Sequence, residues 1–315
     1  MYYRKVIGIP QALSYYYFYP LWHSFFTQLG FDIKTSGLTH RHKLDAGIAI
    51  VPGEACLPLK CYFGHLLSLI NEVDFIFVPR LVCLKKKPKI KLGCPKLIGL
   101  PDMVRALVPQ AHILTLDIDL RNEPEVKSYM KMARSLGART GDAQRAYRAA
   151  FNEFKQYKKE RSQAASALNK AGNNKITIGL LGHSYLLQDN YLNFNLTKKL
   201  SDLECCVIDC HSFSTDEIEM ELPHVESVSW YFEEELLGAA LRFLHMDNIS
   251  GLIYLVSFGC GAGSITNEIV ELEILKDCTI PRLRIIIDEY TGEAGLMTRL
   301  ESFVDMLRLK KGHTP

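Results

Sequence analysis

The feature that most constrains the fold is a regular alternation of short apolar runs with amphipathic stretches. Runs typical of strands lie at Lys5–Ile9, Phe31–Thr35, Ile48–Val51, Asp74–Val78 and His112–Ile118. Helices are expected after Pro20, over about 59–71 and at Asp102–Leu107. Strands that alternate with helices are typical of a parallel sheet covered on both faces. The pattern therefore predicts an α/β fold.

A segment of different composition divides this pattern in two. Residues 123–171 are rich in Lys, Arg, Glu and Ala, and we expect one or two long helices there, ended by Gly172 and the two asparagines after it. Strands then return at Lys175–Leu181, Glu204–Asp209, Leu252–Val256 and Arg284–Ile287, with helices at about 190–201, 231–246, 264–276 and 294–309. The sequence predicts two doubly wound, Rossmann-like domains, residues 1–135 and 175–315, joined by a helical connector at 136–174.

The composition excludes several classes of protein. Hydrophobic residues make up 48% of the 315 residues, so a large buried core is expected. The net charge of +2 gives no general attraction to nucleic acid or anionic membranes. The most apolar stretch, Tyr15–Phe26, is interrupted by Pro20 and His23, and the N-terminal residues lack the features of a signal peptide. We therefore expect a cytoplasmic protein that binds neither nucleic acid nor membrane.

Nine cysteines in a reducing compartment favour metal ligation, catalysis or burial over disulfides. Three of them lie between an expected strand and an expected helix: Cys56 in GEACLPLK, Cys94 in CPKLIGLPD and Cys260 in SFGCGAGS. The carboxyl ends of strands form the ligand-binding edge of such sheets, and helix N-termini favour thiolates. Three thiolates suit a 4Fe-4S cluster with one iron left without a cysteine. Because no CxxC pair is present, burial as ordinary core residues is the alternative.

The other six cysteines are interpreted as packing residues. Cys61 lies on the same expected helix as Cys56, turned about 140° away from it. Cys83 is expected in a loop that approaches the site, and the remaining four are expected along a strand or at a helix end: Cys205, Cys206, Cys210 and Cys278. A second cluster drawn from Cys61, Cys83 or the 205–210 group would give a double-cubane 8Fe cluster, which is the alternative cofactor.

Charged residues accompany the three cysteine motifs. Glu54, Lys60, Arg80, Asp102 and Arg105 lie in or beside them, and Glu289 follows the last expected strand. The carboxylates of Glu54, Asp102 and Glu289 are the candidate catalytic groups, and the cations would offset cluster charge or hold a substrate. The alternative is ordinary ion pairing and helix capping. His65 and His183 are interpreted as hydrogen-bonded packing residues.

Several long motifs resemble one known family. The runs IGIPQALSYYYFYPLWHSFFTQLGF, EACLPLKCYFGH, DFIFVPRLV, CPKLIGLPDMVR, FGCG and IDEYTGEAGLMTRLESFVDML resemble the acyl-CoA dehydratase activase-related family, in order from about residue 6 to residue 307. That family is related to the cluster-binding subunits of 2-hydroxyacyl-CoA dehydratases, benzoyl-CoA-type reductases and double-cubane-cluster proteins. The chain departs from it at Ala262-Gly263, where Pro-Asp is usual, and at Tyr290, where a histidine is commoner.

The resemblance implies two Rossmann-like domains with a 4Fe-4S cluster in the cleft between them, ligated by Cys56, Cys94 and Cys260. It also implies an ATPase of the BadF/BcrA type that passes low-potential electrons to the cluster. Because no phosphate-binding glycine-rich loop is present, that ATPase is expected to be a separate chain. The implied function is an anaerobic reductase or dehydratase component acting on a small molecule, such as a CoA thioester. A non-catalytic electron carrier is the alternative, and a homodimer is a further expectation.

Overall fold

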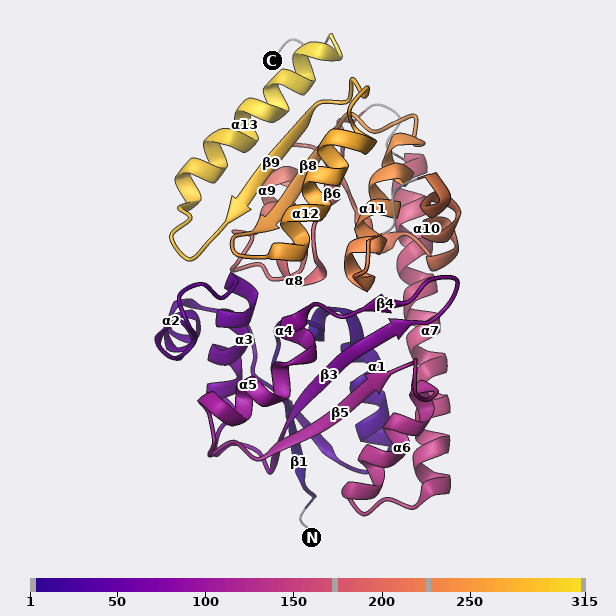
Figure 1. Cartoon of the computed structure of the whole chain (residues 1–315). Coiled ribbons are helices and arrows are strands. Elements are labelled where there is room, and N and C mark those ends of the chain that lie inside the picture. Colours follow the sequence, from indigo (N-terminus) through magenta and orange to yellow (C-terminus); the bar gives the residue numbers. More distant parts are fainter. Residues whose placement is uncertain (1–3, 172–174, 225–227, 313–315) are drawn as a thin grey trace. The chain divides into compact units, whose positions relative to one another are not determined.

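The computed structural model describes residues 4–171, 175–224 and 228–312. The chain forms two compact units (Figure 1): unit 1 comprises Met1–Tyr157 with Ser229–Tyr231, and unit 2 comprises Lys158–Val228 with Phe232–Pro315. The long helix α7 (Thr140–Ala171) runs through the division between them. The residues expected to end this helix, 172–174, lie outside the described part of the chain.

Unit 1 is an α/β unit built on a mostly parallel sheet. Its strands are β1 (Val6–Ile9), β2 (Asp32–Thr35), β3 (Phe75–Lys85), β4 (Lys91–Leu92) and β5 (Ile113–Asp119). Its helices before α7 are α1 (Tyr15–Gln28), α2 (Arg41–Ile50), α3 (Leu57–Leu67), α4 (Pro95–Ile98), α5 (Leu100–Leu107) and α6 (Glu125–Ser135). β2, β1, β3 and β5 are parallel, and β4 pairs antiparallel with the end of β3.

Unit 2 has a fully parallel sheet in the order β7-β6-β8-β9. Its strands are β6 (Thr177–Leu181), β7 (Cys206–Asp209), β8 (Gly251–Ser257) and β9 (Arg282–Ile287). Its helices are α8 (Ser184–Leu187), α9 (Leu196–Asp202), η1 (Cys210–Ser212), α10 (Thr215–Glu221), η2 (Leu222–His224), α11 (Tyr231–Leu244), α12 (Gly261–Ile269), the π-helix η3 (Val270–Ile274) and α13 (Glu293–Lys310). In Figure 1, α12 lies in front of the strands and α9 behind them.

The strand order of unit 2 determines where a ligand is expected to bind. The chain leaves β6 for β7 on one side and returns to β8 on the other, so the strand order reverses between β6 and β8. In doubly wound sheets the crevice outside the carboxyl ends of the strands at such a reversal is the usual binding site. These two parallel sheets with flanking helices confirm the predicted α/β, Rossmann-like fold class.

Aromatic residues of α1 form much of the core of unit 1. The Trp22 and Phe77 rings meet edge to face with their centroids 4.9 Å apart, and Phe25 meets Tyr129 of α6 at 4.8 Å. In unit 2 every residue of β6 is buried, and a Cβ added at Gly179 would lie 2.7 Å from a methyl of Leu252. Burial on both faces explains why these strands are apolar runs without alternation.

Three sequence-based expectations about local structure are wrong. The helix expected after Pro20 begins at Tyr15 and contains that proline. The expected strand Ile48–Val51 is instead the end of helix α2 and the residue after it, because a short apolar run fits either state. Two glycines let α2 pack closely on α3: a Cβ at Gly47 would lie 1.8 Å from the Lys60 carbonyl oxygen, and one at Gly64 would lie 1.8 Å from that of Lys43. Cys83, expected in a loop, lies fully buried in β3.

One further finding concerns the helices as a group. Among the described residues, no helix combines the length and the apolar character that crossing a bilayer requires.

Candidate functional site

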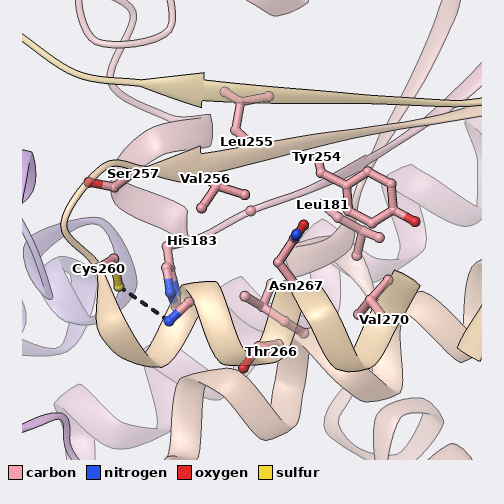
Figure 2. A pocket seen from close by; sticks show the side chains of 13 residues that line it. Leu181, His183, Tyr254, Leu255, Val256, Ser257, Cys260, Thr266, Asn267 and Val270 are labelled. Carbon is pink, nitrogen blue, oxygen red and sulfur yellow. Dashed lines mark hydrogen bonds between the residues drawn. The ribbon is translucent and has the colours of Figure 1, made fainter. Parts of the chain in front are cut away.

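Cys260 lies in the turn between β8 and α12, where the sequence predicted it. It is the N-cap residue of α12, and its Sγ accepts a hydrogen bond from the Gly263 N–H at 3.4 Å, drawn as a dashed line in Figure 2. Its carbonyl oxygen accepts from the N–H of Ser264 at 2.9 Å. The N-terminus of a helix carries unpaired N–H groups and partial positive charge, which favour the thiolate over the thiol. The local backbone therefore favours the thiolate form of Cys260.

Two buried ionisable side chains accompany Cys260 within unit 2. His183 lies two residues after the end of β6 and is the N-cap residue of α8, and Glu233 lies in the first turn of α11. His183 Nε2 and Glu233 Oε1 are 3.0 Å apart, and the two side chains are only 11% and 4% exposed. One ligand atom from each of the three residues lies within 4.8 Å of the other two. Because His183 and Cys260 follow the neighbouring strands β6 and β8, this group occupies the reversal point of the sheet.

The charges of this group stabilise one another. Burial lowers the pKa of His183, but the carboxylate of Glu233 and the sulfur of Cys260 outweigh it and raise that pKa to about 10. Burial raises the pKa of Cys260, but the adjacent, positively charged ring of His183 outweighs it and lowers that pKa below its ordinary value. An imidazolium next to a thiol is a known means of producing a reactive or ligating thiolate.

A small pocket of about 30 Å³ lies beside Cys260 and His183 (Figure 2), between α12 and the sheet. That volume holds about one water molecule or one ion. Five buried polar atoms in or beside the pocket have no hydrogen-bond partner: His183 Nε2, Glu233 Oε2, Tyr254 Oη, Thr266 Oγ1 and Asn267 Oδ1. The close Nε2–Oε1 approach is thus an ion pair without hydrogen-bond geometry. Since buried polar groups in proteins are normally paired, these atoms indicate a site that receives a small polar occupant.

Cys56 and Cys94 belong to unit 1 and also cap helices. Cys56 is buried and precedes α3, and Cys94 is half-buried and precedes the single turn of α4. Both residues have extended backbone conformations and a proline in the first helical turn, Pro58 and Pro95. Cys56 therefore lies between two helices rather than after a strand, whereas Cys94 follows the short strand β4. Both cysteines therefore occupy the expected position directly before a helix.

The three candidate catalytic carboxylates have different surroundings. Glu54 is exposed in the turn between α2 and α3, and Glu289 is half-exposed in the turn after β9. Asp102 is exposed and accepts hydrogen bonds from Arg80 at 2.6 and 2.9 Å and from Arg105 at 2.9 Å. The Arg80 hydrogen bond is the main reason that the pKa of Asp102 is lowered. Asp102 is therefore held as a charged ion-pair partner, and all three carboxylates stay candidates by position alone.

The remaining cysteines of unit 2 resemble packing residues. Cys210 donates its S–H to the Gly182 carbonyl oxygen at 3.5 Å, and burial raises its pKa well above the ordinary value. Burial likewise raises the pKa of Cys205 to about 11. Neither thiol is stabilised as a thiolate, in contrast to Cys260.

Sequence reasoning missed the two partners of Cys260. The sequence suggests a packing role for His183, yet this residue lies two positions after a strand and so satisfies the same strand-end rule that selected Cys260. Glu233 lies inside a helix, and no local pattern distinguishes it from the neighbouring Glu234 and Glu235. Only the packing of α11 identifies it.

The fold defines the class of the protein as doubly wound α/β. One of its two sheets has a candidate metal-binding edge, with thiolate, imidazole and carboxylate donors. Residues 6–212 match the family model described as the CoA enzyme activase uncharacterised domain (DUF2229), and the chain belongs to that family. The activase-related part of the predicted resemblance is thereby confirmed. The matched stretch contains Cys56, Cys94 and His183 and ends before Glu233 and Cys260.

The other two comparisons add little. No curated protein matches the chain. Among solved structures, the chain is similar to that of the SBP FpvC from P. aeruginosa in complex with a Ni²⁺ ion, with 12% identity, 99% of each chain covered and a TM-score of 0.29. A similarity of that size carries no argument about fold or function.

Proposed function

We propose that this protein holds a 4Fe-4S cluster through Cys56 and Cys94 of unit 1 and Cys260 of unit 2. It would accept low-potential electrons from a separate BadF/BcrA-type ATPase and reduce a small substrate, such as a CoA thioester. The observation that carries the proposal is that each of the three cysteines is the N-cap residue of a helix. Cluster ligation requires thiolates, and none of these three described cysteines forms a disulfide.

The surroundings of Cys260 leave its sulfur accessible to a metal. A Cβ at position 263 would lie 3.1 Å from the Cys260 sulfur, so the glycine keeps that side of the sulfur open. The lowered pKa of Cys260 favours the thiolate that an iron atom binds. When bound, such a cluster supplies one-electron chemistry, and three cysteines leave one iron with an open position for a small ligand.

Iron content tests ligation directly. We expect about four irons per chain after anaerobic reconstitution, and a large loss of iron in Cys56→Ala, Cys94→Ala and Cys260→Ala. Cys278→Ala is the matched control, because its sulfur accepts a hydrogen bond from the nearby Ile280 N–H at 3.4 Å, and it should retain full iron. About eight irons would favour the double-cubane alternative. Full iron in Cys94→Ala would contradict the assignment.

A second measurement separates a reductase component from an electron carrier. The EPR signal of the reduced cluster should shift on addition of cyanide or a small thiol if one iron is open to ligands. Glu54→Gln, Asp102→Asn and Glu289→Gln should change that response more than they change iron content. A signal that no added ligand shifts, together with no turnover in the presence of the ATPase and a reductant, would leave the carrier role.

A further inference from the structure

We propose that unit 2 also carries a site for one divalent transition-metal ion, formed by Cys260, His183 and Glu233 without Cys56 or Cys94. This inference goes beyond the cluster, because it concerns a single ion and residues of one unit. The three donors come from three separate elements: the turn after β8, the turn after β6 and the first turn of α11. All three are therefore supported by secondary structure on the same sheet edge.

The spacing of the donor atoms suits one ion. The ligand atoms lie within 4.8 Å of one another, and the His183–Glu233 pair is already at 3.0 Å. Around a tetrahedral zinc-type ion, sulfur, nitrogen and oxygen ligands at their usual bond lengths are about 3.5 Å apart. Side-chain adjustments on the order of 1 Å thus bring all three into bonding distance.

The hydrogen-bonding state of the donors also indicates a missing occupant. Glu233 Oε2 and His183 Nε2 are buried and have no hydrogen-bond partner. A Cβ at residue 263 would lie 3.1 Å from Cys260 Sγ and 3.5 Å from His183 Nε2, so a side chain there would fill the space between the donors. The glycine leaves this space open, and the adjoining pocket leaves a fourth position for water or a small ligand.

The donor types determine the class of ion. Thiolate, imidazole and carboxylate together suit Zn²⁺, Fe²⁺ or Co²⁺, whereas Mg²⁺ and Ca²⁺ require oxygen ligands. A thiol–histidine–carboxylate catalytic relay is the competing arrangement, and it uses the two ring nitrogens for different partners. In unit 2 the same nitrogen, Nε2, meets the carboxylate and borders the space beside the sulfur. Because the carboxylate and the sulfur lie around the same ring nitrogen, the arrangement favours a bound ion over a catalytic relay.

A second cluster of the same residue types in unit 2 lacks these properties. Asp209, Cys210 and His211 also lie close together, but Asp209 pairs with Arg161, and Cys210 and His211 both bond the Gly182 carbonyl oxygen. Their donor atoms are already occupied. His211 therefore supplies a matched control for His183.

Cobalt binding to the full-length, cluster-free protein under anaerobic, reducing conditions tests the proposal. We expect one Co²⁺ per chain with a thiolate-to-cobalt charge-transfer band that Cys260→Ser abolishes. His183→Gln and Glu233→Gln should each weaken binding at least about tenfold. His211→Gln, Cys56→Ala and Cys94→Ala should leave it unchanged, so failure of the cluster assignment and failure of this site give different results.

A glycine pair keeps the test valid if the ligand variants fold poorly. Gly263→Ala should weaken Co²⁺ binding at least about tenfold through its methyl group, while alanine favours the helix itself. Gly261→Ala lies in the same first turn of α12 and points into open space, so its binding should match that of the wild type. Absence of the charge-transfer band in the wild type, or equal binding by Gly263→Ala and Gly261→Ala, would overturn the proposal.

Discussion

A buried histidine in each unit lies against polar partners, and these two histidines differ in charge. In unit 1, both ring nitrogens of His65 meet hydroxyl groups, Ser36 Oγ at 2.7 Å and Thr39 Oγ1 at 2.8 Å. Burial, together with the positive charges of Lys43 and His40, lowers its pKa to about 3. In unit 2, Glu233 and Cys260 overcome burial and raise the pKa of His183 to about 10.

For these two histidines, the partners rather than burial alone account for the difference in pKa. Hydroxyl groups satisfy a neutral ring, which makes His65 a packing residue as the sequence predicted. A carboxylate and a thiol favour a charged ring, which couples His183 to a candidate metal ligand. Strongly perturbed ionisable groups beside a pocket are typical of functional sites. Of the two histidines, His183 of unit 2 is therefore the candidate for a functional role.

The largest effect is expected from breaking the packing that positions His65. Gly64→Ala would place a Cβ 1.8 Å from the Lys43 carbonyl oxygen, so α2 and α3 must separate. We expect a loss of about 4 kcal/mol in the free energy of unfolding, measured by urea denaturation. Gly53→Ala, whose Cβ meets nothing within 4 Å, should change stability by less than about 0.5 kcal/mol. Equal stability of the two variants would contradict the close helix crossing.

Removing the charged partner of His183 should have the next largest effect. Glu233→Gln leaves a buried imidazole without its carboxylate, and we expect a loss of about 3 kcal/mol in unfolding free energy at pH 7. Because the pKa of His183 is raised, its stabilising contribution is complete below about pH 6.5 and is lost as the pH rises through about 10. The variant should lose this alkaline dependence.

A surface ion pair provides the control for that variant. Glu268→Gln removes the partner of Arg284 on the exposed side of unit 2, and we expect a loss of less than about 1 kcal/mol. If Glu233→Gln destabilised the protein no more than Glu268→Gln does, His183 would not be a buried cation.

Unit 1 should lose stability at acidic pH, whereas the contribution of His183 in unit 2 is lost at alkaline pH. The pKa of His65 is lowered, so its contribution to stability is lost as the pH falls from about 6.5 towards 3. Between pH 7 and pH 5 this amounts to about 2 kcal/mol of unfolding free energy. Denaturation at both pH values should show that His65→Gln reduces this dependence. The same acid slope in wild type and variant would assign the loss to other groups.

The smallest effect is expected in the reactivity of one thiol. In metal-free protein, the alkylation rate of Cys260 by iodoacetamide should reach its midpoint below the ordinary pKa of a cysteine, because His183 stabilises the thiolate. His183→Gln should move this midpoint to higher pH, whereas His65→Gln should not. Mass spectrometry of the modified peptide resolves Cys260 from the other cysteines. An unchanged midpoint in His183→Gln would show that His183 does not stabilise the Cys260 thiolate.

The sequence predicted more of the fold than of the site. Short apolar runs separated by amphipathic stretches predicted both sheets, because buried parallel strands differ in length and pattern from amphipathic helices. The strand prediction for Ile48–Val51 is wrong because the helical state of this run depends on the close packing of α2 on α3 at Gly47 and Gly64. Cys260 was predicted from its place after a strand, but Glu233 was not, because its contact with His183 arises from the packing of α11. Long-range packing leaves no local signature.

The most direct test of the contrast between the units is the charge of the two histidines in solution. Long-range ¹H–¹⁵N correlation spectra of ¹⁵N-histidine-labelled protein distinguish neutral from protonated rings, and His65→Gln and His183→Gln assign the signals. We predict that at pH 7 His183 is an imidazolium and His65 is neutral, and that His65 stays neutral to pH 5. Titration of both rings near pH 6.5 would contradict the account.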